Sequence, residues 1–226
     1  MRMKHVIVVS VLMVIVATAI GLKCRAGYRD LNGEDEPLDN FIVSAMPKNF
    51  LEMVLDGAME QLDDENIILA VTCEEPTFFR PHCTTEKVKV QKIFKGEGLA
   101  VGEEIEFARE GTCIFMDEEL RIAGKPPINM GFVNQMIVGK SYLIFLDKKL
   151  VSMDGTEIYV QPEDIMFAPI FCYEDLESYP LELVDEDWNS VEYVSAKGSE
   201  FFFSNQEDVD RMLAFKEEML AKYPLD

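Results

Sequence analysis

The chain has 226 residues, a length that suits one domain with appendages or at most two small domains. Its hydrophobic content of 48% is sufficient for a buried core, and 42 acidic against 21 basic residues give a net charge of −21. Because such a surface repels phosphate groups, we expect no nucleic-acid partner. The negative charge suits cationic partners, cell-wall polycations or divalent ions. The alternative is that it only keeps the protein soluble.

Residues 1–23 have the pattern of an export signal, with a basic start followed by an apolar run. Ala17 and Ala19 match the small-residue site that a signal peptidase cleaves. The alternative is an uncleaved membrane anchor from Val6 to Leu22, at the short end of a membrane span. Both interpretations predict an extracytoplasmic domain, which is either secreted or anchored to the membrane by this N-terminal segment.

Residues 24–45 are polar and acidic and are expected to form a linker. The basic residues Lys23, Arg25 and Arg29 flank the apolar run on its other side, which leaves the opposite membrane orientation open. The folded part of the chain is expected to begin after this linker, as a single globular domain from residue 46 to residue 226.

The domain is expected to open on a helix and a strand. Pro47 precedes an amphipathic segment, residues 48–62, whose apolar side chains fall on one helical face. Residues 66–73 are rich in branched side chains and predict a strand. A loop with two prolines follows, from residue 74 to residue 82.

The stretch from residue 85 to residue 107 organises the rest of the domain. Apolar and polar side chains alternate on both sides of a turn that contains Gly96, Gly98 and Gly102. Period-two alternation indicates strands with one buried face, and the glycines supply the backbone freedom for the turn. The apolar positions of the two strands are Val88, Val90, Ile93, Ile105 and Phe107.

Further strands are predicted beyond a long excursion, residues 117–138. Residues 139–147 form a more fully buried strand and residues 157–161 another. Residues 166–173 predict a short strand or an extended cover over the sheet. Residues 176–203 match no motif.

A final amphipathic helix is predicted at residues 205–222. Ser204 and Glu207 have the spacing of a capping box at its start. Five main strands with a helix before and after them predict a mainly β fold with flanking helices (α+β), arranged as a five-stranded OB-like barrel. The pattern alone leaves a β-sandwich open as the alternative.

The phrases VKVQKIFKG, GEEIEF and GKSYLIFL, together with Cys113 and Cys172, resemble the netrin-like module. That module is shared by tissue inhibitors of metalloproteinases, complement C-terminal domains and many bacterial surface proteins. The similarity covers residues 66–175. It implies an OB-like barrel, an extracellular setting and a role in binding proteins or matrix.

Metalloproteinase inhibitors with this module begin with Cys-x-Cys, whose first cysteine chelates the catalytic zinc. This chain has no Cys-x-Cys, and Cys24 is separated from the first predicted strand by a long polar segment. We therefore do not expect zinc-protease inhibition by that route. A protease inhibitor that presents a loop or a terminus to an enzyme cleft stays the alternative to a binding module.

The cysteines are interpreted as crosslinks. Cys73 and Cys83 bracket a short loop between two predicted strands, and Cys113 and Cys172 follow strands that are near neighbours in an OB-type barrel. These positions predict the disulfides Cys73–Cys83 and Cys113–Cys172 and leave Cys24 as the odd cysteine, free or intermolecular. Five reduced thiols are the alternative that a cytosolic domain favours.

Catalytic residue types are scarce. His82 is the only histidine after the leader, which excludes a histidine-based metal cluster, and we expect no metal and no cofactor. A hydrolase that uses Cys83 or Cys73 is the remaining enzymatic hypothesis. The prediction is that the protein is not an enzyme.

Phe78 and Phe79 lie in the loop between the two prolines, next to Arg80. An exposed aromatic pair is typical of a contact patch, whereas a buried pair would cap the barrel. We interpret Phe78, Phe79 and Arg80 as the partner contact. The chain is thus expected to be an extracytoplasmic, non-enzymatic module that binds a protein or cell-surface partner.

Overall fold

The computed structural model describes residues 2–26, 30–48, 50–80, 83–109, 121–151 and 155–225. The chain forms two compact units, Met1–Pro37 and Leu38–Asp226. The first contains helix α1 (Arg2–Ala26) and the 3-10 helix η1 (Leu31–Gly33).

No helix in the described ranges, α1 included, is long and apolar enough to cross a membrane. Cleavage near Ala19 and export stay predictions.

The folded unit begins earlier than the predicted linker boundary at residue 45. Strand β1 (Ile42–Ser44) pairs in antiparallel fashion with β11 (Ser190–Glu192) and in parallel with β6 (Pro127–Ile128). Ile42 and Val43 are fully buried in this small sheet. Their burial explains why this part of the predicted linker belongs to the fold, and it gives the unassigned segment 176–203 a structural role through β11 and the short helix α4 (Tyr193–Ala196).

The five predicted strands are present in one larger sheet. They are β2 (Ile67–Cys73), β4 (Thr84–Lys95), β5 (Glu104–Arg109), β7 (Ser141–Leu146) and β9 (Glu157–Val160). The strand order is β10-β7-β2-β4-β5-β9-β8, where β8 is Lys148–Val151, β10 is Ile170–Cys172, and β3 (Phe78–Phe79) pairs with β4. Among the described strands of this sheet, only β5 and β9 form a parallel pair. The segment 166–173 therefore contributes a short strand, one of its two predicted forms.

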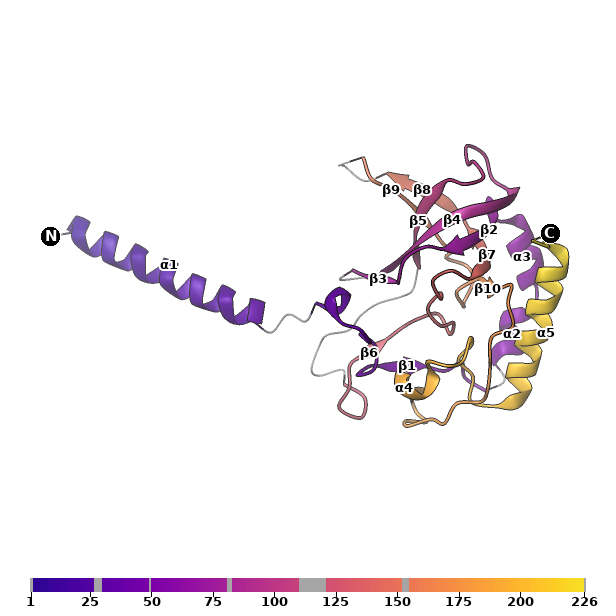
Figure 1. Cartoon of the computed structure of the whole chain (residues 1–226). Coiled ribbons are helices and arrows are strands. Elements are labelled where there is room, and N and C mark those ends of the chain that lie inside the picture. Colours follow the sequence, from indigo (N-terminus) through magenta and orange to yellow (C-terminus); the bar gives the residue numbers. More distant parts are fainter. Residues whose placement is uncertain are drawn as a thin grey trace. The chain divides into compact units, whose positions relative to one another are not determined.

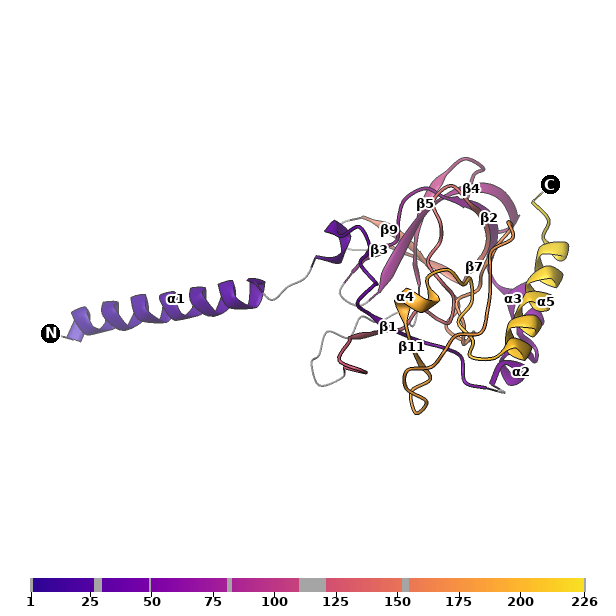
Figure 2. The same ribbon diagram turned by 60° about the horizontal axis from the view of Figure 1, so that its bottom comes forward.

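The large sheet is strongly curved but not closed (Figure 1, Figure 2). The protein is thus a mixed α+β fold, as expected in outline, while a closed five-stranded barrel is not confirmed. The turn between β4 and β5 has the predicted glycine geometry, since Gly96, Gly98 and Gly102 all have positive φ angles.

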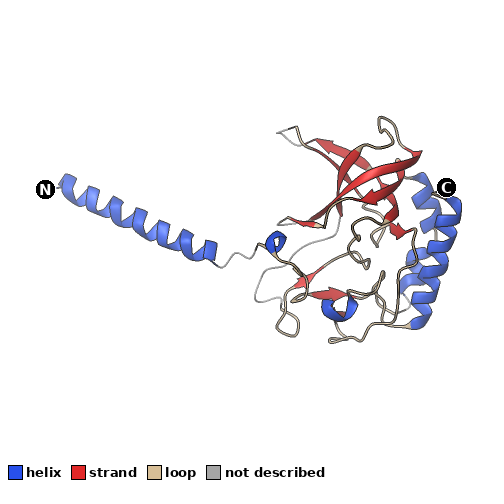
Figure 3. Cartoon of the chain, viewed as in Figure 1, coloured by secondary structure: helices blue, strands red, loops and turns tan. Residues whose placement is uncertain are grey.

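The helices differ from the prediction in two ways: the first is divided in two, and the last has a different capping residue. The single helix expected at residues 48–62 is two helices, α2 (Phe50–Leu55) and α3 (Ala58–Asp64). Gly57, with φ 79°, breaks the helical path between them. Helix α5 (Gln206–Lys222) is capped by Asn205, whose side chain accepts a hydrogen bond from Asp208 N at 2.9 Å, so Ser204 is not the capping residue. Figure 3 shows α2, α3 and α5 together along one side of the strands.

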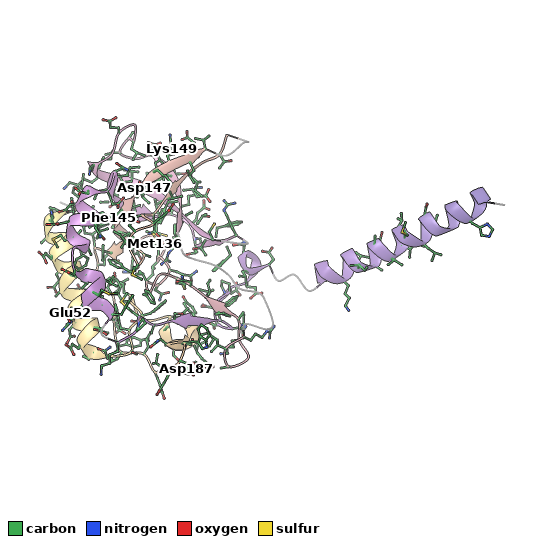
Figure 4. All side chains as sticks on the ribbon, turned by 180° about the vertical axis from the view of Figure 1, so that it is seen from behind. Glu52, Met136, Phe145, Asp147, Lys149 and Asp187 are labelled. Atoms are coloured by element: carbon green, nitrogen blue, oxygen red, sulfur yellow. The ribbon has the colours of Figure 1, made fainter. Side chains whose placement is uncertain are left out.

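An aromatic cluster joins the sheet to α5. The Phe171 ring on β10 lies 6.2 Å from the rings of Phe145 and Phe167 and 6.0 Å from that of Phe215 on α5, measured between centroids. All four side chains are buried, and Phe145 is labelled in the side-chain view of Figure 4. Edge-to-face aromatic contacts of this kind add to the stabilisation from burial itself.

We expect Phe171→Ala to lower the free energy of unfolding by about 3–5 kcal/mol, because it removes a fully buried ring and leaves a cavity between β10 and α5. Urea unfolding followed by circular dichroism measures the change. Val101→Ala, at an exposed position in the β4–β5 turn, is the matched control and should change stability by less than about 0.5 kcal/mol. A similar loss in both variants would contradict a core centred on Phe171.

Candidate binding surface

The predicted contact residues lie on one hairpin. Strand β3 pairs with the start of β4, with Phe78 opposite Thr85 and Phe79 opposite Thr84, and Arg80 N donates to Cys83 O at 2.9 Å. Adjacent residues of a strand point to opposite faces, so the two phenylalanines separate. Phe78 is 48% exposed, whereas Phe79 is only 7% exposed. The expected aromatic pair is therefore one exposed ring and one core ring.

Arg80 contacts the exposed ring of Phe78. Its guanidinium carbon lies 5.2 Å from the centroid of the Phe78 ring, and its Nη2 donates to Glu106 Oε1 at 2.6 Å. A guanidinium over an aromatic face is a cation–π contact, which orients both groups. We call Phe78, Arg80 and Glu106 the hairpin surface. It combines one solvent-exposed aromatic ring with an ion pair at its side.

A buried ion pair lies at the base of the same hairpin. Thr77 Oγ1 donates to both carboxylate oxygens of Glu86, at 2.9 and 3.0 Å, and Glu86 Oε1 lies 3.7 Å from Arg109 Nη1. Both charged side chains are essentially inaccessible to solvent. Arg109 also donates to three backbone carbonyls of the excursion after β5, those of Met130, Val133 and Asn134, at 2.7–3.1 Å.

Burial changes the protonation chemistry of this pair. Loss of water around Glu86 raises its pKa to about 7, although the Arg109 charge and the Thr77 hydrogen bond both favour the carboxylate. Burial likewise lowers the pKa of Arg109, against the opposing effect of Glu86. The pair therefore fixes the hairpin to the excursion, and Glu86 changes charge near neutral pH.

Sequence analysis missed this pair, although the sequence contains a sign of it. Glu86 has the same parity as the buried Val88 and Val90, and Arg109 has the same parity as the buried Ile105 and Phe107. Charged residues that continue an apolar strand face are unusual, because an unpaired buried charge is strongly unfavourable. Two such residues on paired strands predict an internal ion pair.

The predicted disulfides are corrected by the structure. Cys73, Cys83 and Cys172 carry thiols, and no disulfide occurs among the described residues. Cys73 is opposite Val88 on β4, five residues along the strand from Cys83, so the strand register separates the two sulfur atoms. Cys113, the other half of the second predicted disulfide, lies outside the described residues, as does His82.

Two of these thiols are poor nucleophiles. The Cys73 thiol donates to Glu75 O at 3.3 Å, and the Cys172 thiol lies 3.1 Å from Glu174 Oε2. Burial raises the pKa of each to about 12, and nearby carboxylates add to the effect. A thiol that stays protonated does not attack an acyl group, so Cys73 is unsuited to the nucleophile role of the hydrolase hypothesis.

Other ligand features are few in the part of the chain that the structure describes. It contains no group of three or more His, Cys, Asp or Glu side chains placed to hold a metal ion. A cavity of about 170 Å³ lies beside Asn134, Tyr142 and Tyr193, but their polar side-chain atoms are hydrogen-bonded. A second cavity, of about 220 Å³, lies beside Gln161.

No family model matches the sequence, and a search of curated proteins found no significant match.

The Glu86 pKa predicts a specific pH dependence of stability. A carboxyl whose pKa is raised from 4.5 to about 7 by folding binds its proton more tightly in the folded state, so stability falls as pH rises from about 4.5 to about 7. The Glu86 contribution should be on the order of 3 kcal/mol across this window. Urea unfolding at pH 5 and pH 8 measures it in wild type and in Glu86→Gln, which cannot titrate. Equal pH dependence in the two proteins would show that Glu86 does not titrate there.

Burial also predicts the order of thiol labelling. Cys83 is half-buried and should react with iodoacetamide first, whereas the fully buried Cys73 and Cys172 should react only as the fold opens. Peptide mass mapping after timed quenching gives the rate for each cysteine, with urea-unfolded protein as the control. If Cys73 and Cys83 stay unlabelled together in unfolded, unreduced protein, they form a disulfide after all.

Proposed function

We propose that the folded unit is a non-enzymatic binding module outside the cytoplasm, which recognises a protein or cell-surface partner through the hairpin surface. Phe78 carries the proposal. A large aromatic ring that stays nearly half exposed on a paired strand is costly in water, and such rings are enriched at the centres of protein interfaces.

The surroundings of Phe78 support a preorganised contact. Its strand is paired with β4, and Thr77, one residue before it, donates to the buried Glu86. Arg80 holds the ring from one side while its own charge is paired with Glu106. Because these groups are already ordered, binding would lose little conformational entropy.

We also propose that the large sheet is a partly open barrel of the OB type, as the resemblance to the netrin-like module implies. The chain connection between β7 and β8 favours it. Only Asp147 separates these strands, and its amide donates to Val160 O on β9 at 2.9 Å. β7 pairs with β2 and β8 pairs with β9, so one bent segment contacts both ends of the β2-β4-β5-β9 series. OB barrels are characteristically open in part.

We propose a non-enzymatic function because the candidate catalytic groups Cys73 and Glu86 are poorly suited to catalysis. Cys73, one nucleophile of the hydrolase hypothesis, has a strongly raised pKa and no histidine beside it among the described residues. Glu86 has a perturbed pKa, but its carboxylate is enclosed by Thr77 and Arg109 and is inaccessible to a substrate. Perturbed groups of this kind also occur in structural ion pairs.

Phe78→Ser tests the proposal. Wild-type and variant proteins are immobilised and exposed to a solubilised cell-surface fraction of the source organism, and captured proteins are quantified by mass spectrometry. We expect a partner that wild type captures and that Phe78→Ser retains at least about tenfold less, a loss typical of an interface hot spot. Val101→Ser, at a position that is 68% exposed against 48% for Phe78 and lies on the β4–β5 turn, is the control and should capture normally.

Phe79→Ser is not an equivalent test, because Phe79 is buried and its loss should destabilise the fold. Unfolding midpoints for Phe78→Ser and Val101→Ser establish that both are folded. Undiminished capture by Phe78→Ser would remove the hairpin surface from the interface. Inhibition of any member of a protease panel by wild type, lost in Phe78→Ser, would favour the inhibitor alternative.

A further inference from the structure

Trp188 is the only tryptophan in the chain, and most of its side chain lies in water. It is 69% exposed, a larger fraction than the 48% of Phe78. Tryptophan is highly buried on average in folded proteins, and it is enriched among the residues that dominate binding at protein interfaces. An exposed indole therefore marks a candidate interaction surface.

The turn that holds Trp188 is ordered by its own hydrogen bonds. Trp188 N donates to Asp185 Oδ1 at 3.0 Å, and Trp188 O accepts from Ser190 Oγ at 3.3 Å. Val184 N donates to Ser190 O at 2.7 Å, and Ser190 N donates to Asp185 O at 2.9 Å, which closes the turn. Asn189 has φ 46°, a left-handed value that asparagine adopts more readily than most residues. We call residues 184–190 the Trp188 turn.

Strand β11 fixes the base of the Trp188 turn to the core. Ser190 begins β11, which pairs with β1, and Asn189 O accepts a hydrogen bond from Ala45 N at 2.8 Å. Ser190 and Val191 are fully buried. Because the backbone beneath the indole is already ordered, a partner that contacts the ring would cost the turn little conformational entropy.

Carboxylates precede the indole in the same turn. Asp185, Glu186 and Asp187 follow one another directly before Trp188, and the side chains of Glu186 and Asp187 are exposed. Figure 4 shows Asp187 at the periphery of the folded unit. In the part of the chain that the structure describes, neither Glu186 nor Asp187 has an ion-pair partner. The exposed ring thus lies in a turn with two uncompensated negative charges.

This combination selects a cationic partner group. The face of an indole attracts cations more strongly than that of any other aromatic side chain. A guanidinium suits both features, because its plane stacks on an aromatic ring and its N–H groups pair with a carboxylate through two parallel hydrogen bonds. An ammonium group is a strongly hydrated point charge without a plane to stack. An apolar partner would remove the carboxylates from water without compensation.

We propose that the Trp188 turn is a docking surface for an arginine-bearing segment of a partner protein, whose guanidinium stacks on Trp188 and pairs with Glu186 or Asp187. The net charge of −21 favours the encounter with a basic segment. This inference goes beyond the proposed function. The Trp188 turn shares no residue with the hairpin surface, so each assignment succeeds or fails by itself.

The probe is the blocked peptide Ac-Ser-Arg-Gly-Arg-Ser-NH2, titrated into the full chain at low ionic strength. Binding is followed by tryptophan fluorescence, which reports on this turn alone because the chain has one tryptophan. A lysine peptide keeps the charge, and a citrulline peptide keeps the side-chain shape without the charge. We expect a saturable fluorescence change with the arginine peptide, at least about threefold weaker binding of the lysine peptide and at least about tenfold weaker binding of the citrulline peptide.

Two variants separate the ring from the charges. Trp188→Leu keeps an apolar side chain without the aromatic face, and the double variant Glu186→Gln/Asp187→Asn keeps the shapes without the charges. Each should bind the arginine peptide at least about threefold more weakly. The matched control is Glu60→Gln/Glu97→Gln, which removes two negative charges at other exposed positions and should bind as wild type does. Chemical-shift titrations compare all variants, because Trp188→Leu lacks the fluorophore, and unfolding midpoints establish that each is folded.

Three results would overturn the assignment. Equal binding of the arginine and lysine peptides, or equal binding by wild type and Trp188→Leu, would mean that the ring contributes no recognition. An equal loss in the double variant and in its matched control would reduce the effect to diffuse attraction between opposite charges. The absence of saturable binding up to the solubility limit of the arginine peptide would exclude the docking surface itself.

Discussion

The fold depends on one buried charge. Arg109 ends β5 inside the curved sheet, and its guanidinium binds Glu86 on the neighbouring strand and three carbonyls of the excursion. Removing one partner of such a pair leaves the other charge buried without compensation, which is far more unfavourable than losing an exposed ion pair. The arrangement therefore links three parts of the molecule, namely the hairpin, strand β5 and the segment from Met130 to Asn134.

Most of the correct predictions, namely the main strands and their buried faces, came from the two-residue periodicity of the strands. Residues with strict alternation, such as Val88 and Val90, occupy the buried face that period two requires, because a one-residue slip would expose the whole apolar set. Strand β1 was missed because it has only three residues and pairs with segments far away in the chain. Local pattern contains no information on such pairings. The same limitation produced the wrong disulfide, since Cys73 on β2 is opposite Val88, whereas Cys83 lies just before the start of β4.

Two residues depart in opposite directions from the usual distribution of polar and apolar groups. Phe78 is a large ring in water, and Gln161 is an amide out of water. Sequence analysis found the first, because a loop aromatic between prolines is visible in one dimension, although only burial separates Phe78 from Phe79. The second could not be predicted, because nothing near Gln161 in the sequence shows that its amide is buried without a hydrogen-bond partner among the described residues.

The open side of the large sheet has a consequence for self-association. Strand β8 is at the end of the strand order, and all four of its residues are exposed, Leu150 and Val151 among them. A free edge with apolar side chains is a template on which a second chain can add a strand. Here Lys148 and Lys149 occupy the start of that edge, and Figure 4 shows Lys149 at the opposite end of the folded unit from Asp187. A second chain on this edge would crowd the two lysines and their ion pairs with Glu163 and Glu157. Charge on one short strand thus disfavours the addition of a further strand at the exposed edge of β8.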